Sequence, residues 1–344
     1  MPQTDLYTEG VRPMKALVHA GKAGLAGLSY KEIDELEPKA GQVRVRLKSA
    51  GLNHRDLFVT NRHKPTDPPL IIGSDGAGII EAVGEGVSNV KVGDSVVINP
   101  SLGWRNNSSA PPAGFEILGL PDNGTFAEKV IVPSENVEQK PKYLTWEEAG
   151  VLSLAALTAY RALFTRGRLQ KGMTVLIPGI GSGVATFLLQ YAKAVGATVF
   201  VTSRSEDKCQ RALELGADKA IDSNSDWKEA LASEKVDLVI ESVGAATFNK
   251  SLAQLRPGGT VVTFGASAGD DIQINIRNFF YGQFNLLGTT MGSTEEYKEM
   301  LDFIQIHQIR PVLDHVYLLN EFEHAFSRME KGAQLGKIGF IFEV

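Results

Sequence analysis

A chain of 344 residues that is 43% hydrophobic has enough apolar material for two packed domains. Its 35 Lys and Arg against 40 Asp and Glu give a formal net charge of -5, without the basic excess that nucleic acid or an anionic membrane surface would require of a partner. The single cysteine, Cys209, excludes an internal disulfide and any thiolate-rich metal cluster. No window approaches the ~20 apolar residues of a membrane helix, and no apolar signal core opens the sequence. We therefore expect a cytoplasmic protein.

The N-terminal part, from Met14 to about Val137, contains short apolar and β-branched runs separated by Gly, Asn, Asp and Pro. Alternating or compact apolar runs of this length are typical of strands. They occupy residues 43–47, 77–83, 95–98 and 126–132. The pattern predicts a small, mostly β domain, built as a partly open barrel.

Beyond Pro141 the pattern changes. Thr145 is an N-cap for a helix predicted over residues 146–163, and strands and helices then alternate at regular intervals. We predict strands at 174–177, 198–202, 236–240 and 260–264, with helices at 184–195 and 206–215. This alternation indicates a parallel, doubly wound sheet with helices on both faces. The tail from about Thr294 carries a helix, a strand at 316–319, a helix from Asn320 and a strand at 338–342.

A glycine-rich turn follows the first of these parallel strands. Residues 178–185 read PGIGSGVA and open a helix, a degenerate relative of the GxGxxG pattern. Small residues here let the backbone approach a pyrophosphate, whose charge is met by amide groups at the helix N-terminus. Gly181, Ser182, Gly183 and Val184 are therefore candidate cofactor ligands, and a purely structural turn is the alternative.

The end of the second parallel strand distinguishes the two nicotinamide cofactors. NAD sites place a carboxylate there, about 20 residues after the glycines. This chain has Ser203, Arg204 and, further on, Lys208, which suit the 2′-phosphate of NADP(H). The alternative is that Arg204 and Lys208 are solvated charges at a helix start.

Several motifs, in order along nearly the whole chain, resemble those of the medium-chain dehydrogenase/reductase superfamily, and specifically of its zinc-lacking, quinone-oxidoreductase-like members. They are SAGLNHRD at 49–56, IGSDGAG at 72–78, EAVG at 81–84, VGD at 92–94, LTAY at 157–160, LGAD at 215–218 and GKI at 336–338. The resemblance implies an α/β protein with two domains. A GroES-like β-barrel catalytic domain would comprise residues 1–140 completed by 294–344, and a Rossmann NADP-binding domain residues 141–293, with the active site between them.

Zinc alcohol dehydrogenases of this superfamily bind the catalytic metal through two cysteines and a histidine. At the matching positions this chain has Asn53, Ser74 and Leu154, none of which supplies a thiolate or imidazole. The structural zinc lobe would fall within residues 100–123, which contain no cysteine. We therefore expect no zinc. Residues 101–124 are either a remodelled loop beside the active site or a disordered surface loop.

Loss of the Lewis acid makes simple alcohol oxidation improbable and favours acceptors that spread negative charge themselves. The leading hypothesis is NADPH-dependent reduction of quinones or α,β-unsaturated carbonyl compounds by hydride transfer. One alternative is an NADPH-binding sensor or scaffold protein with little turnover. Another is a zinc-type alcohol dehydrogenase.

The resemblance assigns roles to single residues. Asn53 would line the nicotinamide or substrate pocket and offer its amide to a carbonyl oxygen. Asp56 would orient its turn and contact the cofactor ribose, with a turn or cap role as the alternative. Thr158 would touch the nicotinamide, or be a helix-packing residue. Lys337 would lie near the cofactor phosphates, or be an exposed strand charge.

Other candidates lie at or near the ends of parallel strands, where backbone groups contact the nicotinamide half of a cofactor. They are Gly244, Gly265, Gly288 and Thr289. No proton donor is assigned, because Phe58 lies where some related enoyl reductases have a tyrosine; solvent can supply the proton. The apolar run at 284–290 could form a sheet edge, and relatives pair through such an edge, so we expect a homodimer.

Overall fold

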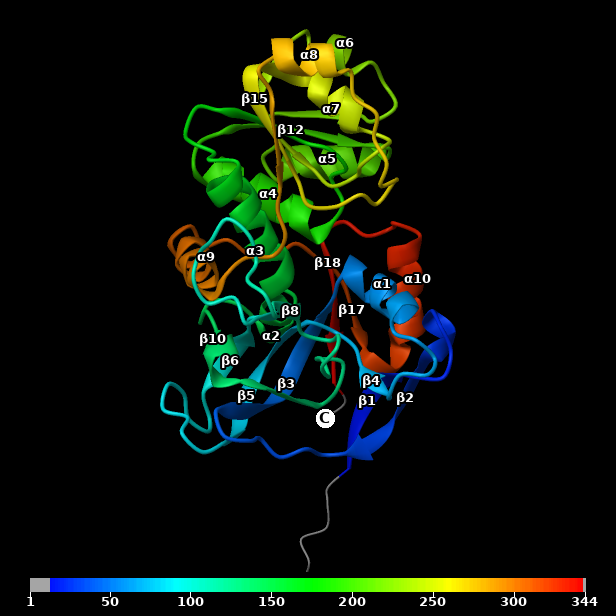
Figure 1. Cartoon of the computed structure of the whole chain (residues 1–344), viewed down its shortest axis with the longest axis vertical. Helices are drawn as coiled ribbons and strands as arrows, with labels where there is room; N and C mark the ends of the chain where they lie inside the picture. Colours follow the sequence, from blue (N-terminus) through cyan, green and yellow to red (C-terminus); the bar gives the residue numbers. More distant parts are fainter. Residues whose placement is uncertain (1–12, 343–344) are drawn as a thin grey trace, which may run out of the picture.

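Six parallel strands form the sheet in the upper part of the molecule, in the order β13, β12, β11, β14, β15, β16 (Figure 1). The computed structural model describes residues 13–342. These strands are β11 (Thr174–Ile177), β12 (Thr198–Ser203), β13 (Lys219–Asp222), β14 (Val236–Glu241), β15 (Leu255–Thr263) and β16 (Asn285–Gly288). The order is that of a doubly wound Rossmann sheet, as the alternation of strands and helices predicted.

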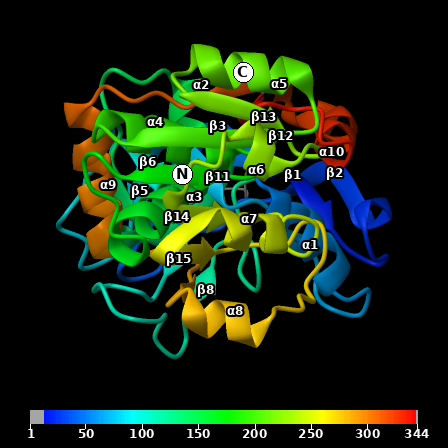
Figure 2. The ribbon, with the colours of Figure 1, turned by 90° about the horizontal axis from the view of Figure 1, so that it is seen from above.

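Successive residues of these strands pack into two different cores. Val175 and Ile177 of β11 join the core beneath α4 (Gly183–Ala194), whereas Leu176 joins the core that contains Trp227 and Phe248. Side chains of a strand point alternately to its two faces, so a strand buried on both faces reads as a continuous apolar run. The helices on this sheet are α4, α5 (Glu206–Glu214), α6 (Trp227–Ala230), α7 (Phe248–Gln254) and α8 (Ile276–Tyr281). Figure 2 shows α5 and α8 toward opposite ends of the row of strands.

A second sheet, in the lower part of Figure 1, contains segments from both ends of the chain. Its order is β10, β6, β5, β3, β18, β17, with β9 paired to β3, and a smaller sheet has the order β2, β1, β4. β18 (Lys337–Ile341) pairs antiparallel with β3 (Gln42–Leu52), so the C-terminal tail completes a sheet begun by the N-terminal part. The remaining strands are β1 (Pro13–His19), β2 (Leu28–Asp34), β4 (Leu70–Ile71), β5 (Asp75–Val83), β6 (Ser95–Ile98), β9 (Lys129–Pro133), β10 (Val137–Gln139) and β17 (Leu313–Leu318). The exact domain boundaries at 140 and 294 stay a prediction.

The single helix expected over residues 146–163 is broken, which corrects that prediction. It consists of α2 (Trp146–Gly150), α3 (Ser153–Tyr160) and a π-helical turn (Arg161–Arg166). Thr145 does cap α2, accepting a hydrogen bond from Glu148 N. A Cβ on Gly150 would lie 2.1 Å from Ser49 Oγ, so α2 packs tightly on β3 before the chain turns into α3.

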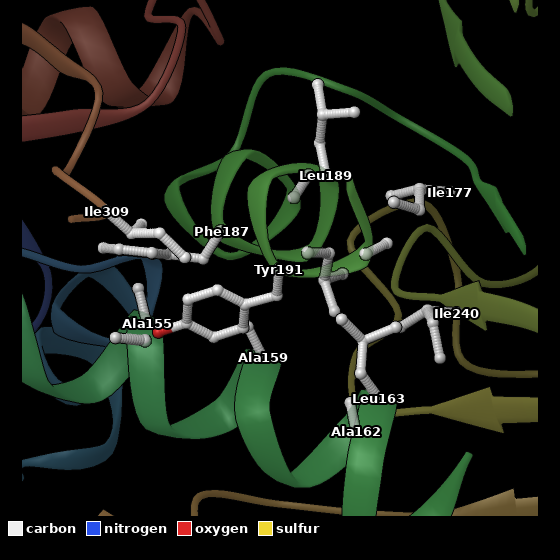
Figure 3. Close-up of a cluster of buried hydrophobic side chains, with 14 of the residues drawn as sticks. Ala155, Ala159, Ala162, Leu163, Ile177, Phe187, Leu189, Tyr191, Ile240 and Ile309 are labelled. Carbon is white, nitrogen blue, oxygen red and sulfur yellow. The ribbon is translucent and has the colours of Figure 1, made fainter. Parts of the chain in front are cut away.

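Small residues also let α3 approach α4. Ala155 and Ala159 of α3 face Tyr191 of α4, whose ring is fully buried (Figure 3). Burial raises the pKa of the Tyr191 hydroxyl well above its ordinary value. This contact joins the helix that follows the lower sheet to the helix that opens at the glycine-rich turn.

Other element ends also shift from their expected positions. β15 begins at Leu255 rather than at 260, and β9 begins at Lys129 rather than at 126. The helix expected from Asn320 is α10 (Phe322–Glu330), preceded by a 3-10 turn (Leu319–Glu321). The other helices are α1 (His54–Arg62) and α9 (Thr294–Ile306).

Residues 101–124 have a defined conformation, so the alternative of a disordered loop is wrong. They carry the short strands β7 (Ser101–Leu102) and β8 (Glu116–Ile117), which pair with each other. Trp104 is 1% exposed and donates its indole N–H to Ser108 Oγ at 2.9 Å. The segment is thus fixed by a buried aromatic anchor and not by thiolates.

A buried ion pair holds this segment against α3 and α9. Arg161 Nη1 donates to both carboxylate oxygens of Glu296 at 2.7 and 2.9 Å, and Arg161 Nη2 donates to Ser108 O at 2.7 Å. The guanidinium also lies over the Trp104 ring, 4.6 Å from its centroid. The backbone of α9 also holds the segment, because Thr294 N donates to Trp104 O at 2.7 Å.

Across residues 13–342, none of the helices has the length and apolar character needed to cross a membrane.

We expect Arg161→Met to lower the free energy of unfolding by about 3–5 kcal/mol, because it leaves the Glu296 carboxylate buried without its cation. Urea unfolding at neutral pH measures this loss. The control is Arg310→Met, which breaks the ion pair between Arg310 and Glu148. The Arg310 side chain is 49% exposed, so this variant should lose less than about 1 kcal/mol of unfolding free energy. Trypsin cleavage at exposed Arg105 should increase in the first variant alone. Equal losses in both variants would contradict this role of the pair.

Candidate active site

The glycine-rich turn connects β11 to α4 at the carboxyl edge of the parallel sheet. Gly179 has a φ of 74°, a conformation that favours glycine, and Ile180 N donates to Thr202 O at 2.8 Å. Ser182 is the N-cap of α4, and its hydroxyl accepts from Ala185 N at 3.1 Å. The open end of α4 therefore presents backbone N–H groups at this edge, a geometry that fits an anionic cofactor.

The glycines of this turn have close neighbours. A Cβ on Gly183 would lie 2.3 Å from Lys337 Cδ, and one on Gly181 would lie 3.2 Å from Lys208 Nζ. Gly336 N donates to Gly181 O at 2.9 Å, so the turn is also paired with the segment before β18. The structure thus brings the turn, Lys208 and Lys337 together, although they lie far apart in the sequence.

The residues expected near a 2′-phosphate lie where β12 ends and α5 begins. Ser203 is nearly buried, and its hydroxyl accepts from Ser205 N at 3.1 Å, while Arg204 is exposed. Lys208 Nζ donates to Gly332 O at 2.6 Å, which leaves two of its N–H groups for another partner. Burial lowers the pKa of Lys208; Asp314 opposes this, and the nearby cations Arg204 and Arg328 add to it. This cluster of positive charge beside the turn suits a phosphate group.

Lys337 does not lie on the surface. Its side chain is 3% exposed, and its ammonium donates to Leu52 O at 3.0 Å, Asn53 Oδ1 at 2.5 Å and Asp75 Oδ2 at 3.2 Å. An ammonium has three N–H groups, so all of them are used within the lower sheet. The alternative of an exposed strand charge is wrong, and a phosphate contact would require Lys337 to leave at least one of these partners.

Asn53 is held from both ends of its amide. Its Oδ1 accepts from Lys337, and its Nδ2 donates to Asp75 Oδ2 at 2.9 Å and to Gly51 O at 3.4 Å. Asp75 Oδ1 in turn accepts from Leu154 N at 2.7 Å, at the start of α3. We call Asn53, Asp75 and Lys337 the buried triad; it connects α1, β5, β18 and α3. Asp75 was not among the predicted site residues, although its single charge in the small, apolar motif IGSDGAG was a usable signal.

Asp56 forms the capping box of α1. Its Oδ2 accepts from Asn53 N at 2.8 Å, and its Oδ1 is buried with no partner among residues 13–342. Burial raises the pKa of Asp56 to about 6, which Arg55, the hydrogen bond from Asn53 and Lys337 oppose. The carboxyl group is fully buried, and this geometry favours the cap role over contact with a cofactor ribose.

The positions that correspond to zinc ligands have other partners here. Ser74 Oγ donates to Leu118 O at 2.7 Å and accepts from Arg55 Nη1 at 2.6 Å. Asn53 contacts the Lys337 ammonium, so each of these two positions meets a protein cation. Among the described residues no cluster of three or more His, Cys, Asp or Glu side chains could hold a metal ion. This donor set does not fit a catalytic zinc.

Thr158 and the strand-end candidates lie around the same edge. Thr158 is 5% exposed, and its hydroxyl donates to Leu154 O at 2.8 Å and approaches Met291 Sδ at 3.9 Å. Gly265 follows β15, and Gly288 ends β16, where it pairs in register with Thr263. Thr289 Oγ1 is a buried hydroxyl without a partner within residues 13–342. The candidates therefore gather at the carboxyl edge, and their contacts with a cofactor stay a prediction.

Glu241, which the sequence reasoning missed, fixes the loop that contains Gly244. Its carboxylate is fully buried and accepts from Val243 N at 2.7 Å and Gly244 N at 3.1 Å. The hydroxyls of Thr247 and Ser251 complete its hydrogen bonds. No signal other than a lone acid at the end of an apolar strand could have identified it.

Comparisons with known proteins agree with this architecture. Residues 39–142 match the family described as Alcohol dehydrogenase GroES-like domain, and residues 183–305 match Zinc-binding dehydrogenase. A zinc-type alcohol dehydrogenase-like protein of Schizosaccharomyces pombe is 34% identical, covering 94% of this chain and 98% of that protein. A crotonyl-CoA reductase of Streptomyces avermitilis is 30% identical over 80% of this chain and 68% of its own length.

A solved structure described as an NAD-dependent alcohol dehydrogenase superposes with a TM-score of 0.88 at 33% identity, covering 95% of this chain and 99% of its own. The Rossmann sheet, the GroES-like domain completed by the tail and these similarities lead to one conclusion. The chain belongs to the medium-chain dehydrogenase/reductase superfamily, as a zinc-type alcohol dehydrogenase-like, NAD(P)-dependent oxidoreductase.

Proposed function

We propose that this protein is an NADPH-dependent reductase of quinones or α,β-unsaturated carbonyl compounds that works without a catalytic zinc. The observation that carries the proposal is the pair of cations at the positions of the zinc ligands. Arg55 contacts Ser74 at 2.6 Å and Lys337 contacts Asn53 at 2.5 Å, where a zinc enzyme supplies imidazole and thiolate. A divalent cation at this place would meet two positive charges and neither of these ligands.

Without a Lewis acid, the acceptor has to spread the incoming negative charge over its own atoms. Quinones and enones do so because their carbonyl groups are conjugated. The name of the similar crotonyl-CoA reductase describes reduction of an α,β-unsaturated acyl thioester, which is chemistry of the same kind. This relative supports the enone class, whereas the alcohol dehydrogenases among the relatives support the second candidate, a zinc-type alcohol dehydrogenase.

When bound, the reduced nicotinamide cofactor supplies the hydride. The residues of this chain bind the cofactor and orient it. The α4 N-terminus with Gly181, Ser182 and Gly183 is positioned to accept the pyrophosphate, and Ser203, Arg204 and Lys208 the 2′-phosphate. The buried triad fixes the turn of α1 against the start of α3, so the site is preorganised before ligands enter.

The proposed activity is tested by mixing the purified protein with NADPH and either 1,4-benzoquinone or a panel of enones, and following nicotinamide absorbance. We expect NADPH oxidation that a metal chelator leaves unchanged, and no oxidation of primary or secondary alcohols with NADP⁺. Alcohol oxidation that is lost on chelation and restored by zinc would establish the zinc-type alcohol dehydrogenase instead. Tight NADPH binding without turnover across the whole panel would favour the sensor or scaffold hypothesis.

The cofactor preference is tested by the double variant Arg204→Ala with Lys208→Ala. We expect the Kd of NADPH to rise by about 10- to 100-fold, because charge-assisted hydrogen bonds to the 2′-phosphate are lost, and the Kd of NADH to change by less than about threefold. Titration of nicotinamide fluorescence measures both constants. Lys228→Ala, at an exposed lysine on α6, is the matched control. Equal losses for both cofactors would refute the phosphate assignment.

We further propose that two copies pair through β16, the strand that ends the parallel sheet within residues 13–342. The adjoining helix α8 has no buried residue, and Ile276, Phe280 and Tyr281 are 66%, 48% and 71% exposed. Leu286 on β16 is also exposed. A second copy related by two-fold symmetry would pair with the unpaired edge and cover these apolar side chains, which a single copy leaves in water.

Light scattering during size-exclusion chromatography tests this pairing. We expect the wild type to elute as a dimer and the variant Ile276→Asp with Leu286→Asp as a monomer, since buried unpaired carboxylates oppose association. The control is Ile306→Asp, at an apolar residue of α9 that is 76% exposed. A monomeric wild type, or a double variant that stays dimeric, would overturn the proposal.

A further inference from the structure

Arg55, in the first turn of α1, carries a guanidinium that is only partly satisfied. Its Nη1 donates to Ser74 Oγ at 2.6 Å and to Leu118 O at 3.0 Å, which uses both of its hydrogens. Both partners are neutral. Among residues 13–342 the Nε and Nη2 groups have no hydrogen-bond partner, and neither atom is sealed from solvent. Three directed N–H groups are therefore available to a ligand.

This guanidinium also lacks a direct counter-ion. No carboxylate of the described residues lies within 4.0 Å of it. Burial lowers the pKa of Arg55 and the cation Arg62 adds to this, while Asp56 and Asp75 only partly oppose it. A largely buried cation without an ion pair is costly, and such groups concentrate at functional sites.

The other cation and the amide beside this guanidinium are already engaged. All three N–H groups of Lys337 have partners, and the Asn53 amide is held by Lys337 and Asp75. Arg55 is thus the cation beside the zinc-ligand positions, within the described part of the chain, that keeps free donors. Its partner Ser74 is adjacent to Asp75, and the Lys337 stem of the buried triad packs on Gly183 of the cofactor turn.

We propose that Arg55 binds the carbonyl oxygen of the acceptor and stabilises the negative charge that this oxygen gains. The inference rests on the proposed function and specifies its substrate class as acceptors whose reduction produces an enolate or a hydroquinone anion. A guanidinium presents parallel N–H donors and stays protonated at all working pH values, so it supplies the positive charge that a metal supplies elsewhere.

For an enone, a hydride adds to the β-carbon and forms a C–H bond there. The electron pair of the C=C bond moves toward the carbonyl group, and the resulting enolate oxygen accepts hydrogen bonds from Arg55. A proton from water then adds to the α-carbon and gives the saturated ketone, while the nicotinamide cofactor is oxidised by two electrons. Arg55 holds charge in this scheme and transfers no proton.

The first test compares Arg55→Met and Arg55→Lys with wild type in the NADPH oxidation assay. For an active acceptor we expect kcat/KM to fall about 100- to 1000-fold in Arg55→Met, as when one oxyanion donor is removed. The kcat/KM of Arg55→Lys should be about tenfold higher than that of Arg55→Met, because lysine restores the positive charge but not the planar pair of N–H donors. The Kd of NADPH should stay within about twofold of the wild-type value, because the cofactor phosphates lie elsewhere.

Arg62→Met is the matched control, because Arg62 is an exposed arginine at the other end of α1. We expect it to keep wild-type kinetics. A purely structural role of Arg55 in holding Leu118 would instead lower thermal stability and weaken NADPH binding together with turnover. That result, or unchanged kcat/KM in Arg55→Met, would overturn the proposal.

The second test needs no turnover and uses 4-nitrophenol as a chromogenic analogue of the charged oxygen. In the wild-type complex with NADP⁺ we expect the bound phenol to ionise with a pKa at least about one unit below that of the free phenol, because the guanidinium favours the phenolate. Arg55→Met should abolish the shift and Arg62→Met should retain it. An unshifted pKa in the wild type would overturn the proposal even if the variants fail to fold. The two proposals can also fail separately. If the pKa shift is lost only in Arg55→Met but the protein reduces no acceptor, the oxyanion site stands and the proposed reductase activity is rejected.

Discussion

The Lys337 ammonium is the interaction on which the rest of the site depends. It comes from the C-terminal strand, passes over Gly183 at the start of α4 and ends between Asn53 and Asp75 of the N-terminal part. One buried cation thus joins the glycine-rich turn, the first turn of α1 and, through Asp75, the start of α3. A charge buried this deeply is tolerated because all of its N–H groups are satisfied and a carboxylate lies beside it.

The two positions that the resemblance matches to zinc ligands are hydrogen-bonded within the protein. They carry an amide, Asn53, and a hydroxyl, Ser74, and each of these is hydrogen-bonded to a cation of the protein. The two cations differ in use, since Lys337 has no N–H group left, whereas Arg55 has three. Lys337 therefore fixes the geometry of the site, whereas Arg55 keeps N–H groups available for a ligand.

A second buried cation, Arg161, fixes the segment 101–124. Trp104 and the Arg161–Glu296 pair hold it against α3 and α9, the helices on either side of the Rossmann sheet in the sequence. In a lobe with no cysteine, aromatic packing and a buried ion pair fix the loop. Both sets of contacts involve α3 or the turn that continues it, because Asp75 accepts from Leu154 N and Arg161 directly follows Tyr160.

The sequence by itself determined the fold class and the place of the glycine-rich turn. Period-two and continuous apolar runs mark the strands. Glycine is favoured at 179 by its positive φ and at 183 by close packing on Lys337. It also pointed to Asn53, Thr158 and Lys337 through the resemblance, but not to the direction in which their side chains point. Only the tertiary structure decided that Lys337 turns inward, that Asp56 is a buried cap and that Arg55 keeps free donors. These properties depend on partners such as Asp75, Leu118 and Leu52, which lie far away along the chain, and no local pattern encodes which distant groups will satisfy a hydrogen bond.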